Sequence, residues 1–98
     1  MSATLRELAR AAAGAIAAFD AASAEARRDM GTGALILCRD TREAAETALE
    51  AYAEALYDRG RVMLGDDVYA YLGRVRLGIV VGAWAIRCVA MAEEVGGG

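Results

Sequence analysis

The sequence predicts an all-α protein, a single-domain antiparallel three-helix bundle spanning residues 1–98. Proline is absent, and 24 of the 98 residues are Ala, the residue with the highest helix propensity. Glycine clusters in 31–33 and 60–65 divide the chain into three stretches of similar length. In each stretch apolar residues recur at intervals of three and four, as on one face of a helix. We therefore expect helices over about 3–29, 33–59 and 66–94, with short connections that favour up-down-up packing.

The first stretch, residues 3–29, has a start signal and a regular apolar seam. Thr4 or Ser2 can cap this helix, and Glu7 stands three residues beyond Thr4, as in a capping box. The steps of three and four residues are those of a coiled-coil-like helix. The seam consists of Leu5, Leu8, Ala12, Ala15, Phe19, Ala22 and Ala26.

The second stretch, residues 33–59, admits two starts. Thr32 can cap one long helix, whereas Asp40 and Glu43 would form the capping box of a shorter helix, with 34–38 as a separate turn or strand. We favour the long helix, because nothing breaks it and a lone strand would have no partner. Its expected apolar seam consists of Ala34, Leu37, Thr41, Ala44, Ala48, Ala51 and Ala55.

The third stretch, residues 66–94 with a cap at Asp66 or Asp67, is apolar on two faces. The faces are offset by two residues, or about 200° around a helix, so they lie on opposite sides. One face consists of Val68, Leu72, Val75, Ile79, Gly82, Ile86 and Val89. The other consists of Ala70, Leu77, Val81, Trp84, Cys88 and Met91. A three-helix bundle covers one side and part of the other, so we expect a homodimer formed through this helix.

Glycine inside a helix costs about 1 kcal/mol relative to Ala, so glycines in the third stretch need a reason. Gly78 and Gly82 stand one turn apart, where small residues let a neighbouring helix approach closely. Tight packing within the monomer and packing between two copies are both consistent with this pattern. The predicted oligomer seam consists of Gly78, Val81, Gly82, Trp84 and Met91.

The composition excludes most catalytic chemistry. His and Lys are absent, which removes the commonest general base, the Ser-His-Asp triad and the phosphate-loop lysine. Cys38 and Cys88 are fifty positions apart, which fits neither zinc-ligand spacing nor a Cys-x-x-Cys pair, so we expect free thiols in a reducing cytoplasm. The prediction is a protein that is not an enzyme and has no cofactor and no metal.

An acidic stripe is the most informative feature of the second stretch. From 40 to 58 there are six acidic residues and a single Arg, Arg42, where a helix surface usually interleaves opposite charges. A row of anions one turn apart suits an Arg/Lys groove built for DNA or RNA, although a solvated helix face would look the same. The stripe consists of Glu43, Glu46, Glu50, Glu54 and Asp58.

Arginine and tyrosine gather around the second connection, where they predict a partner-binding rim or local ion pairs. Asp58, Asp66 and Asp67 are interleaved with them, and the net charge is −3, so we expect no direct binding of nucleic acid. The predicted rim consists of Tyr57, Arg59, Arg61, Tyr69 and Arg74.

Two apolar stretches imitate targeting signals. Residues 11–19 are mostly Ala and are followed by Asp20, and residues 77–92 are shorter than the about 20 residues of a spanning helix and contain Arg87. We therefore expect a cytoplasmic protein without a membrane span.

The leading functional hypothesis is a non-enzymatic protein-interaction module. Its acidic face would occupy the basic, nucleic-acid-binding groove of a larger complex, as an inhibitor from a phage or mobile element, of the anti-CRISPR kind, would do. The alternatives are a structural self-assembling helical subunit and a small membrane-associated protein.

Overall fold

The computed structural model describes the backbone of residues 3–96 and the side chains of residues 3–91, and every regular element in that range is an α-helix. The helices are α1 (Leu5–Arg28), α2 (Thr32–Asp58), α3 (Val62–Arg76) and α4 (Ala83–Gly96). The all-α prediction is confirmed. The expected count of three is wrong, because the third stretch folds as two helices.

Thr4 caps α1, as its sequence predicts. The Thr4 hydroxyl accepts a hydrogen bond from the Glu7 backbone N–H at 3.1 Å and donates one to Glu7 Oε1 at 3.2 Å. Ser2, the other candidate cap, lies outside the described residues. At the other end of α1, Asp29 Oδ1 accepts a hydrogen bond from the Gly31 N–H at 3.1 Å, which stabilises the turn into α2.

α2 is one helix of 27 residues, which confirms the long-helix prediction. Its N-cap is Gly31, without a side-chain capping bond, so the expected cap at Thr32 is wrong. Thr41 donates from its hydroxyl to the Leu37 carbonyl at 2.8 Å, as a Thr in the interior of a helix does. The alternative start at Asp40 is therefore wrong.

The apolar seam expected on α2 is displaced by about one residue from the face that is buried. Leu37, Ala44 and Ala51 are exposed, and the rest of that seam is only half-buried. Because the larger side chains on the adjacent face bury more apolar area, they decide which side of an alanine-rich helix faces the core. The buried residues are Ala45, Leu49, Tyr52, Ala53 and Leu56.

Residues 77–82 break the helix expected over 66–94. The caps expected at Asp66 and Asp67 are wrong, because α3 begins at Val62 and contains both. Gly78 has φ +79° and Gly82 has φ +90°, a left-handed conformation that residues with a side chain rarely adopt. These two glycines therefore form the 77–82 connection rather than the packed face of a helix.

The end of α3 is a Schellman motif. The Gly78 N–H donates to the Val75 carbonyl at 2.9 Å, and the Ile79 N–H donates to the Arg74 carbonyl at 2.9 Å. The same pair of bonds ends α2, from Gly60 to the Tyr57 carbonyl at 3.0 Å and from Arg61 to the Leu56 carbonyl at 2.8 Å. Gly60 also has a positive φ, +77°.

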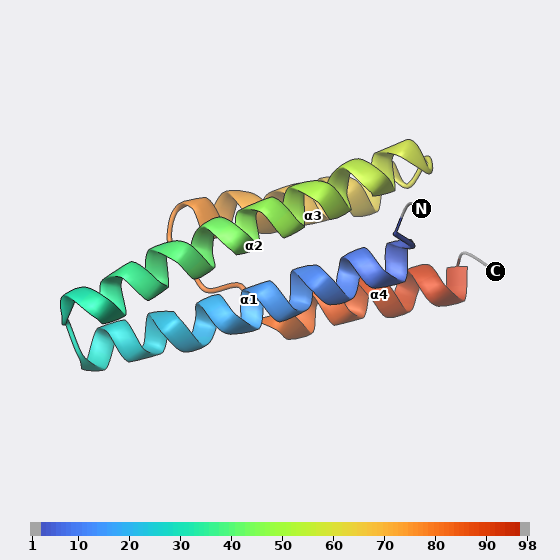
Figure 1. Ribbon diagram of the computed structural model, residues 1–98. Helices are drawn as coiled ribbons and strands as arrows, with labels where there is room; N and C mark the ends of the chain where they lie inside the picture. Colours follow the sequence, from blue (N-terminus) through green and yellow to red (C-terminus); the bar gives the residue numbers. More distant parts are fainter. Residues whose placement is uncertain (1–2, 97–98) are drawn as a thin grey trace.

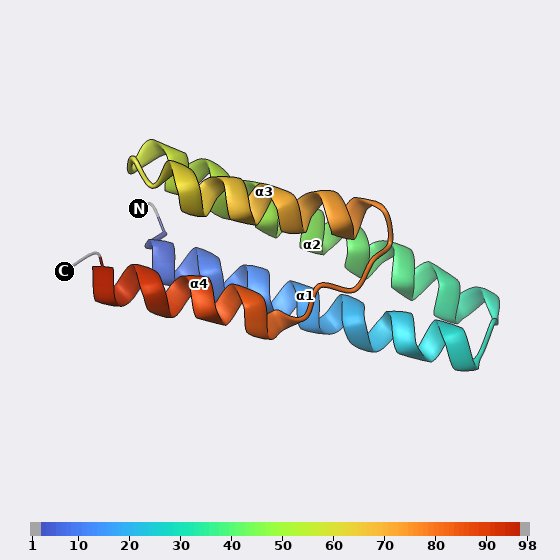
Figure 2. The ribbon, with the colours of Figure 1, turned by 180° about the vertical axis from the view of Figure 1, so that it is seen from behind.

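α1 and α2 form a long hairpin, and α3 and α4 pack on it (Figure 1). α3 packs on α2, and α4 packs on α1, both toward the end of the hairpin where α1 begins and α4 ends (Figure 2). The opposite end, with the turn between α1 and α2, projects beyond α3 and α4. We call residues 27–44 the hairpin tip, and no side chain in it is buried.

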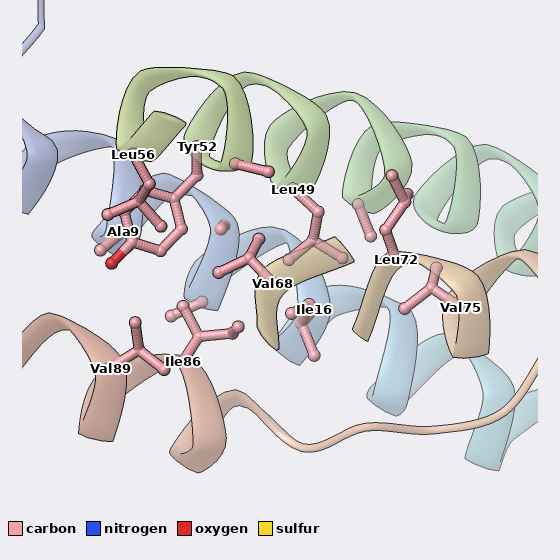
Figure 3. Packing of buried hydrophobic residues seen from close by; sticks show 14 of the residues in the cluster. Ala9, Ile16, Leu49, Tyr52, Leu56, Val68, Leu72, Val75, Ile86 and Val89 are labelled. Carbon is pink, nitrogen blue, oxygen red and sulfur yellow. The ribbon is translucent and has the colours of Figure 1, made fainter. Parts of the chain in front are cut away.

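The hydrophobic core lies at the covered end and joins all four helices. Figure 3 shows Ile16 of α1, Leu49 of α2, Val68 of α3 and Ile86 of α4 pointing toward one another. Each of these side chains is fully buried, and burial of a side chain of this size contributes about 1.5–3 kcal/mol.

Because the third stretch is broken into α3 and α4, both halves bury residues of the same predicted face. Five of the seven residues of its first expected face are buried: Val68, Leu72, Val75, Ile86 and Val89. On the second expected face Leu77, Trp84 and Met91 are exposed. Because the chain reverses between α3 and α4, both helices turn the same face to the core, α3 over α2 and α4 over α1.

Candidate functional site

The acidic stripe lies along α2, next to the face that α2 buries. Glu46, Glu50 and Glu54 directly follow the buried residues Ala45, Leu49 and Ala53. Successive residues of a helix differ by about 100°, so the stripe is turned away from the core by roughly that angle. Glu43, Glu50, Glu54 and Asp58 are exposed, and Glu46 is half-buried.

The charge of the stripe is largely uncompensated. One ion pair reaches it, from Arg42 Nε to Glu46 Oε1 at 3.8 Å. The carboxylates of Glu43, Glu50 and Glu54 make no hydrogen bond or ion pair with the part of the chain that the structure describes. Like charges four residues apart on a helix destabilise it by a few tenths of a kcal/mol per pair, so the stripe carries a small cost to the fold.

The predicted Arg/Tyr rim is only partly brought together. Tyr57 and Tyr69 stack with ring centroids 5.6 Å apart, and Arg59 and Arg61 cap the helix ends at the α2–α3 connection. Arg74 lies in the last turn of α3, thirteen residues after Arg61 and therefore about 20 Å away along the helix. Arg74 does not belong to the same surface.

Tyr57 is held by α3 through contacts that were not predicted from the sequence. Its hydroxyl donates to Asp66 Oδ1 at 2.5 Å, and this hydrogen bond, together with desolvation, raises the pKa of Tyr57 to about 12. Its ring lies directly on Gly65, where an added Cβ would come within 2.7 Å of the ring. Tyr57 is thus part of the packing between α2 and α3 and stays protonated at neutral pH.

The residues of the predicted oligomer seam do not lie on one helix. Gly78, Val81 and Gly82 belong to the 77–82 connection. Trp84, in the first turn of α4, is 77% exposed, and Met91 is exposed further along the same helix. The helix through which dimerisation was expected is therefore interrupted within the seam itself.

Besides Val62 and Met63 in the first turn of α3, large apolar side chains are exposed at the hairpin tip and in the 77–82 connection. Four of them belong to the hairpin tip: Met30, Leu35, Ile36 and Leu37. Three more, Leu77, Ile79 and Val80, belong to the 77–82 connection, which crosses beside the uncovered part of the hairpin (Figure 2).

α1 and α4 form a basic groove that was not predicted from the sequence. Its volume is about 510 Å³. It is lined by Arg6, Ala9, Arg10, Ala13 and Gly14 of α1 and by Arg87, Ala90 and Met91 of α4. The sequence signal was the four-residue spacing of Arg6 and Arg10, but only the packing of α4 on α1 adds Arg87.

Cys38 on α2 is half-buried and Cys88 on α4 is exposed, and both are free thiols. Within the described residues, no three potential ligands among Cys, Asp and Glu come together as around a metal ion. No described helix combines the length and the apolar character that crossing a membrane requires.

Comparison of the chain with protein-family models, with curated proteins and with solved structures found no match.

Proposed function

We propose that the protein is a non-enzymatic interaction module whose acidic stripe on α2 docks onto a basic surface of another protein. The observation that supports this proposal is the exposed row Glu43, Glu50, Glu54 and Asp58 on one helix, spaced about two turns apart between Glu43 and Glu50 and about one turn apart after that. A groove lined by Arg and Lys for DNA or RNA has the complementary charge. An inhibitor from a phage or mobile element, acting in the cytoplasm in the manner of an anti-CRISPR protein, is one such module.

The part of the stripe that follows the hairpin tip, from Glu46 to Asp58, is presented on a rigid support. α2 is a single helix of 27 residues, and Leu49, Tyr52 and Leu56 fix its second half in the core. A partner would therefore meet carboxylates that are already in place, which lowers the entropic cost of binding.

The same charges explain why the partner should be basic. Docking against Arg or Lys would relieve the repulsion along the stripe and would steer the encounter at low salt. We therefore expect association to weaken as the ionic strength rises.

The test compares two triple variants with the same change in net charge. The stripe variant carries Glu43→Gln, Glu50→Gln and Glu54→Gln. The control carries Glu25→Gln, Asp40→Asn and Asp67→Asn, three exposed acids outside the stripe. Each protein is used to capture partners from a host lysate, and the captured proteins are then challenged with DNA and RNA. We expect wild type and control to retain a nucleic-acid-binding partner that DNA or RNA displaces, and the stripe variant to lose it. Equal capture by both variants contradicts the proposal.

A second candidate function, a self-assembling helical subunit, is favoured by the apolar side chains of the hairpin tip and the 77–82 connection. A monomer rarely exposes a contiguous apolar patch of more than a few hundred Å². The occupant we propose is a second copy of the chain. Its own hairpin, laid against the uncovered tip about a two-fold axis, would extend the four-helix packing of the covered end.

Light scattering at high micromolar concentration tests this second candidate. Wild type should have the mass of a dimer, and Leu37→Glu or Ile79→Glu should shift it toward the monomer. Met63→Glu is the matched control, because Met63 is 82% exposed in the first turn of α3, outside both apolar places. A monomeric wild type excludes self-assembly.

A further inference from the structure

Three arginines line the groove between α1 and α4, so positive charge is concentrated there. Arg6 and Arg10 lie about one turn apart on α1, and Arg87 lines the same groove from α4. None of the eight described residues that line the groove is acidic. Arg28, Arg39 and Arg42, elsewhere on α1 and α2, each have a carboxylate partner within 4 Å.

Arg10 and Arg87 have no such partner. Neither makes a hydrogen bond or an ion pair with the part of the chain that the structure describes, and both are exposed. Arg10 and Arg87 carry the same charge at one groove, and a bound anion would lower the repulsion between them. The guanidinium groups are also permanently charged and present planar forks of N–H donors, which match phosphate oxygens in pairs.

The rest of the groove is apolar. Ala9, Ala13 and Ala90 contribute small side chains, and Met91 contributes a flexible thioether that adapts to the shape of a ligand. The volume of about 510 Å³ lies within the range of small-molecule sites. The groove thus has room for an apolar or planar body beside a charged group.

We propose that this groove binds a small organic phosphate, a phosphomonoester with an apolar or planar body. A phosphomonoester carries about −1.5 to −2 charges at neutral pH, which suits several arginines better than a carboxylate with one charge does. A long nucleic-acid strand is a poorer fit, because the arginines span only about 6 Å along α1 and the whole chain is acidic, with a net charge of −3. This inference is independent of the proposed function, because the acidic stripe lies on α2.

Chemical-shift titration of the isotope-labelled protein provides the test, with phenyl phosphate as the probe. Inorganic phosphate, which has the charged group alone, and benzoate, which has a similar body and one charge, are the comparison ligands. We expect saturable shifts confined to residues around 6–14 and 87–91, with phenyl phosphate binding most tightly and benzoate at least about tenfold more weakly.

Variants separate a built site from a general effect of charge. Arg10→Gln and Arg87→Gln should each weaken phenyl phosphate about tenfold or more. Arg27→Gln and Arg76→Gln remove the same charge at exposed positions outside the groove and should change the affinity less than twofold. Gly14→Leu adds a side chain to the groove wall without altering charge, and it should weaken phenyl phosphate more than inorganic phosphate. Equal losses in groove and control variants, or the absence of localised shifts with phenyl phosphate, would overturn the proposal.

Discussion

At the scale of single residues, Asp20 is a polar residue that the fold leaves partly unsatisfied. Its Oδ1 is shielded from solvent and accepts no hydrogen bond from the described part of the chain, and burial raises the pKa of Asp20 above its ordinary value of 3.8. A raised carboxyl pKa means that the folded state binds the proton more tightly than the unfolded state does. This residue therefore lowers the free energy of unfolding as the pH rises above about 3.8 and through the folded-state pKa.

Replacing Asp20 with Asn removes that penalty. We expect Asp20→Asn to be more stable than wild type at neutral pH and to lose this advantage as the solution is acidified below pH 3.8. Urea unfolding followed by circular dichroism over a pH series measures the difference. Asp67→Asn, on an exposed position of α3, controls for the loss of one charge. A stability difference that stays constant with pH would show that burial of the Asp20 carboxylate is not its cause.

Two glycines of α3 should respond in opposite ways to Ala. At Gly73 an added Cβ meets nothing within 4 Å, so Gly73→Ala should raise the free energy of unfolding by about 0.5–1 kcal/mol through helix propensity. At Gly65 the Cβ would come within 2.7 Å of the Tyr57 ring, so the ring must move. We expect Gly65→Ala to lower the free energy of unfolding by about 1 kcal/mol despite its better propensity.

The tyrosine titration provides a second measurement for Gly65→Ala. If the ring moves, the hydrogen bond from Tyr57 to Asp66 weakens, and the pKa of Tyr57 should fall from about 12 toward 10.0. The ultraviolet absorbance of tyrosinate follows this change, and Gly73→Ala should leave it unaltered. Equal stabilities of the two variants would contradict the close contact between Tyr57 and Gly65.

At the scale of elements, Gly60 and Gly78 show where sequence patterns fail. Both end a helix with the same pair of backbone hydrogen bonds, and both have a positive φ. Gly60 stands between Arg59 and Arg61, so the apolar pattern stops there and the break is predictable. Gly78 stands between Leu77 and Ile79, so the apolar pattern of a helix continues across it, although an apolar residue after the glycine is common in this motif.

The sign of a glycine substitution distinguishes one long helix from two. In a continuous helix, Gly78→Ala and Gly82→Ala would each raise the free energy of unfolding by about 1 kcal/mol. In a connection with positive φ, each substitution should instead lower the free energy of unfolding by about 1–2 kcal/mol. Denaturant unfolding of the two single variants measures this sign, with Gly73→Ala as the helical reference. Stabilisation by either substitution would favour the uninterrupted helix.

The same distinction decides which candidate sites can be found in the sequence. The acidic stripe is contained in one helix, so the spacing from Glu43 to Asp58 was enough to place it. The predicted apolar seam of α2 differs by about one residue from the face that is buried. The reason is that alanine occupies several faces of α2, so its positions do not identify the face that packs in the core. The basic groove needed the reversal between α3 and α4, which brings Arg87 beside α1, and no local pattern contains that information.

At the scale of the whole molecule, stability is distributed unevenly along the hairpin. The side chains that join the four helices lie at one end. The hairpin tip, residues 27–44, projects beyond α3 and α4 (Figure 1). The tip contains no buried side chain. Opening a segment costs roughly what its buried contacts contribute, so the two ends of α2 should open with different free energies. Although α2 is one continuous helix, we therefore expect its first part to open at a lower free energy than its second part.

Hydrogen exchange measures that division. We expect the amides of residues 36–44 to exchange through local opening, well below the global free energy of unfolding, and those of residues 49–56 to exchange near the global value. Uniform protection along α2 in a monomer would contradict the unequal distribution. Protein concentration provides the second variable: if another copy covers the tip, protection of residues 36–44 rises with concentration while that of residues 49–56 stays constant. A gradient that persists at high concentration would mean that the tip remains uncovered, and self-assembly through it would then be excluded.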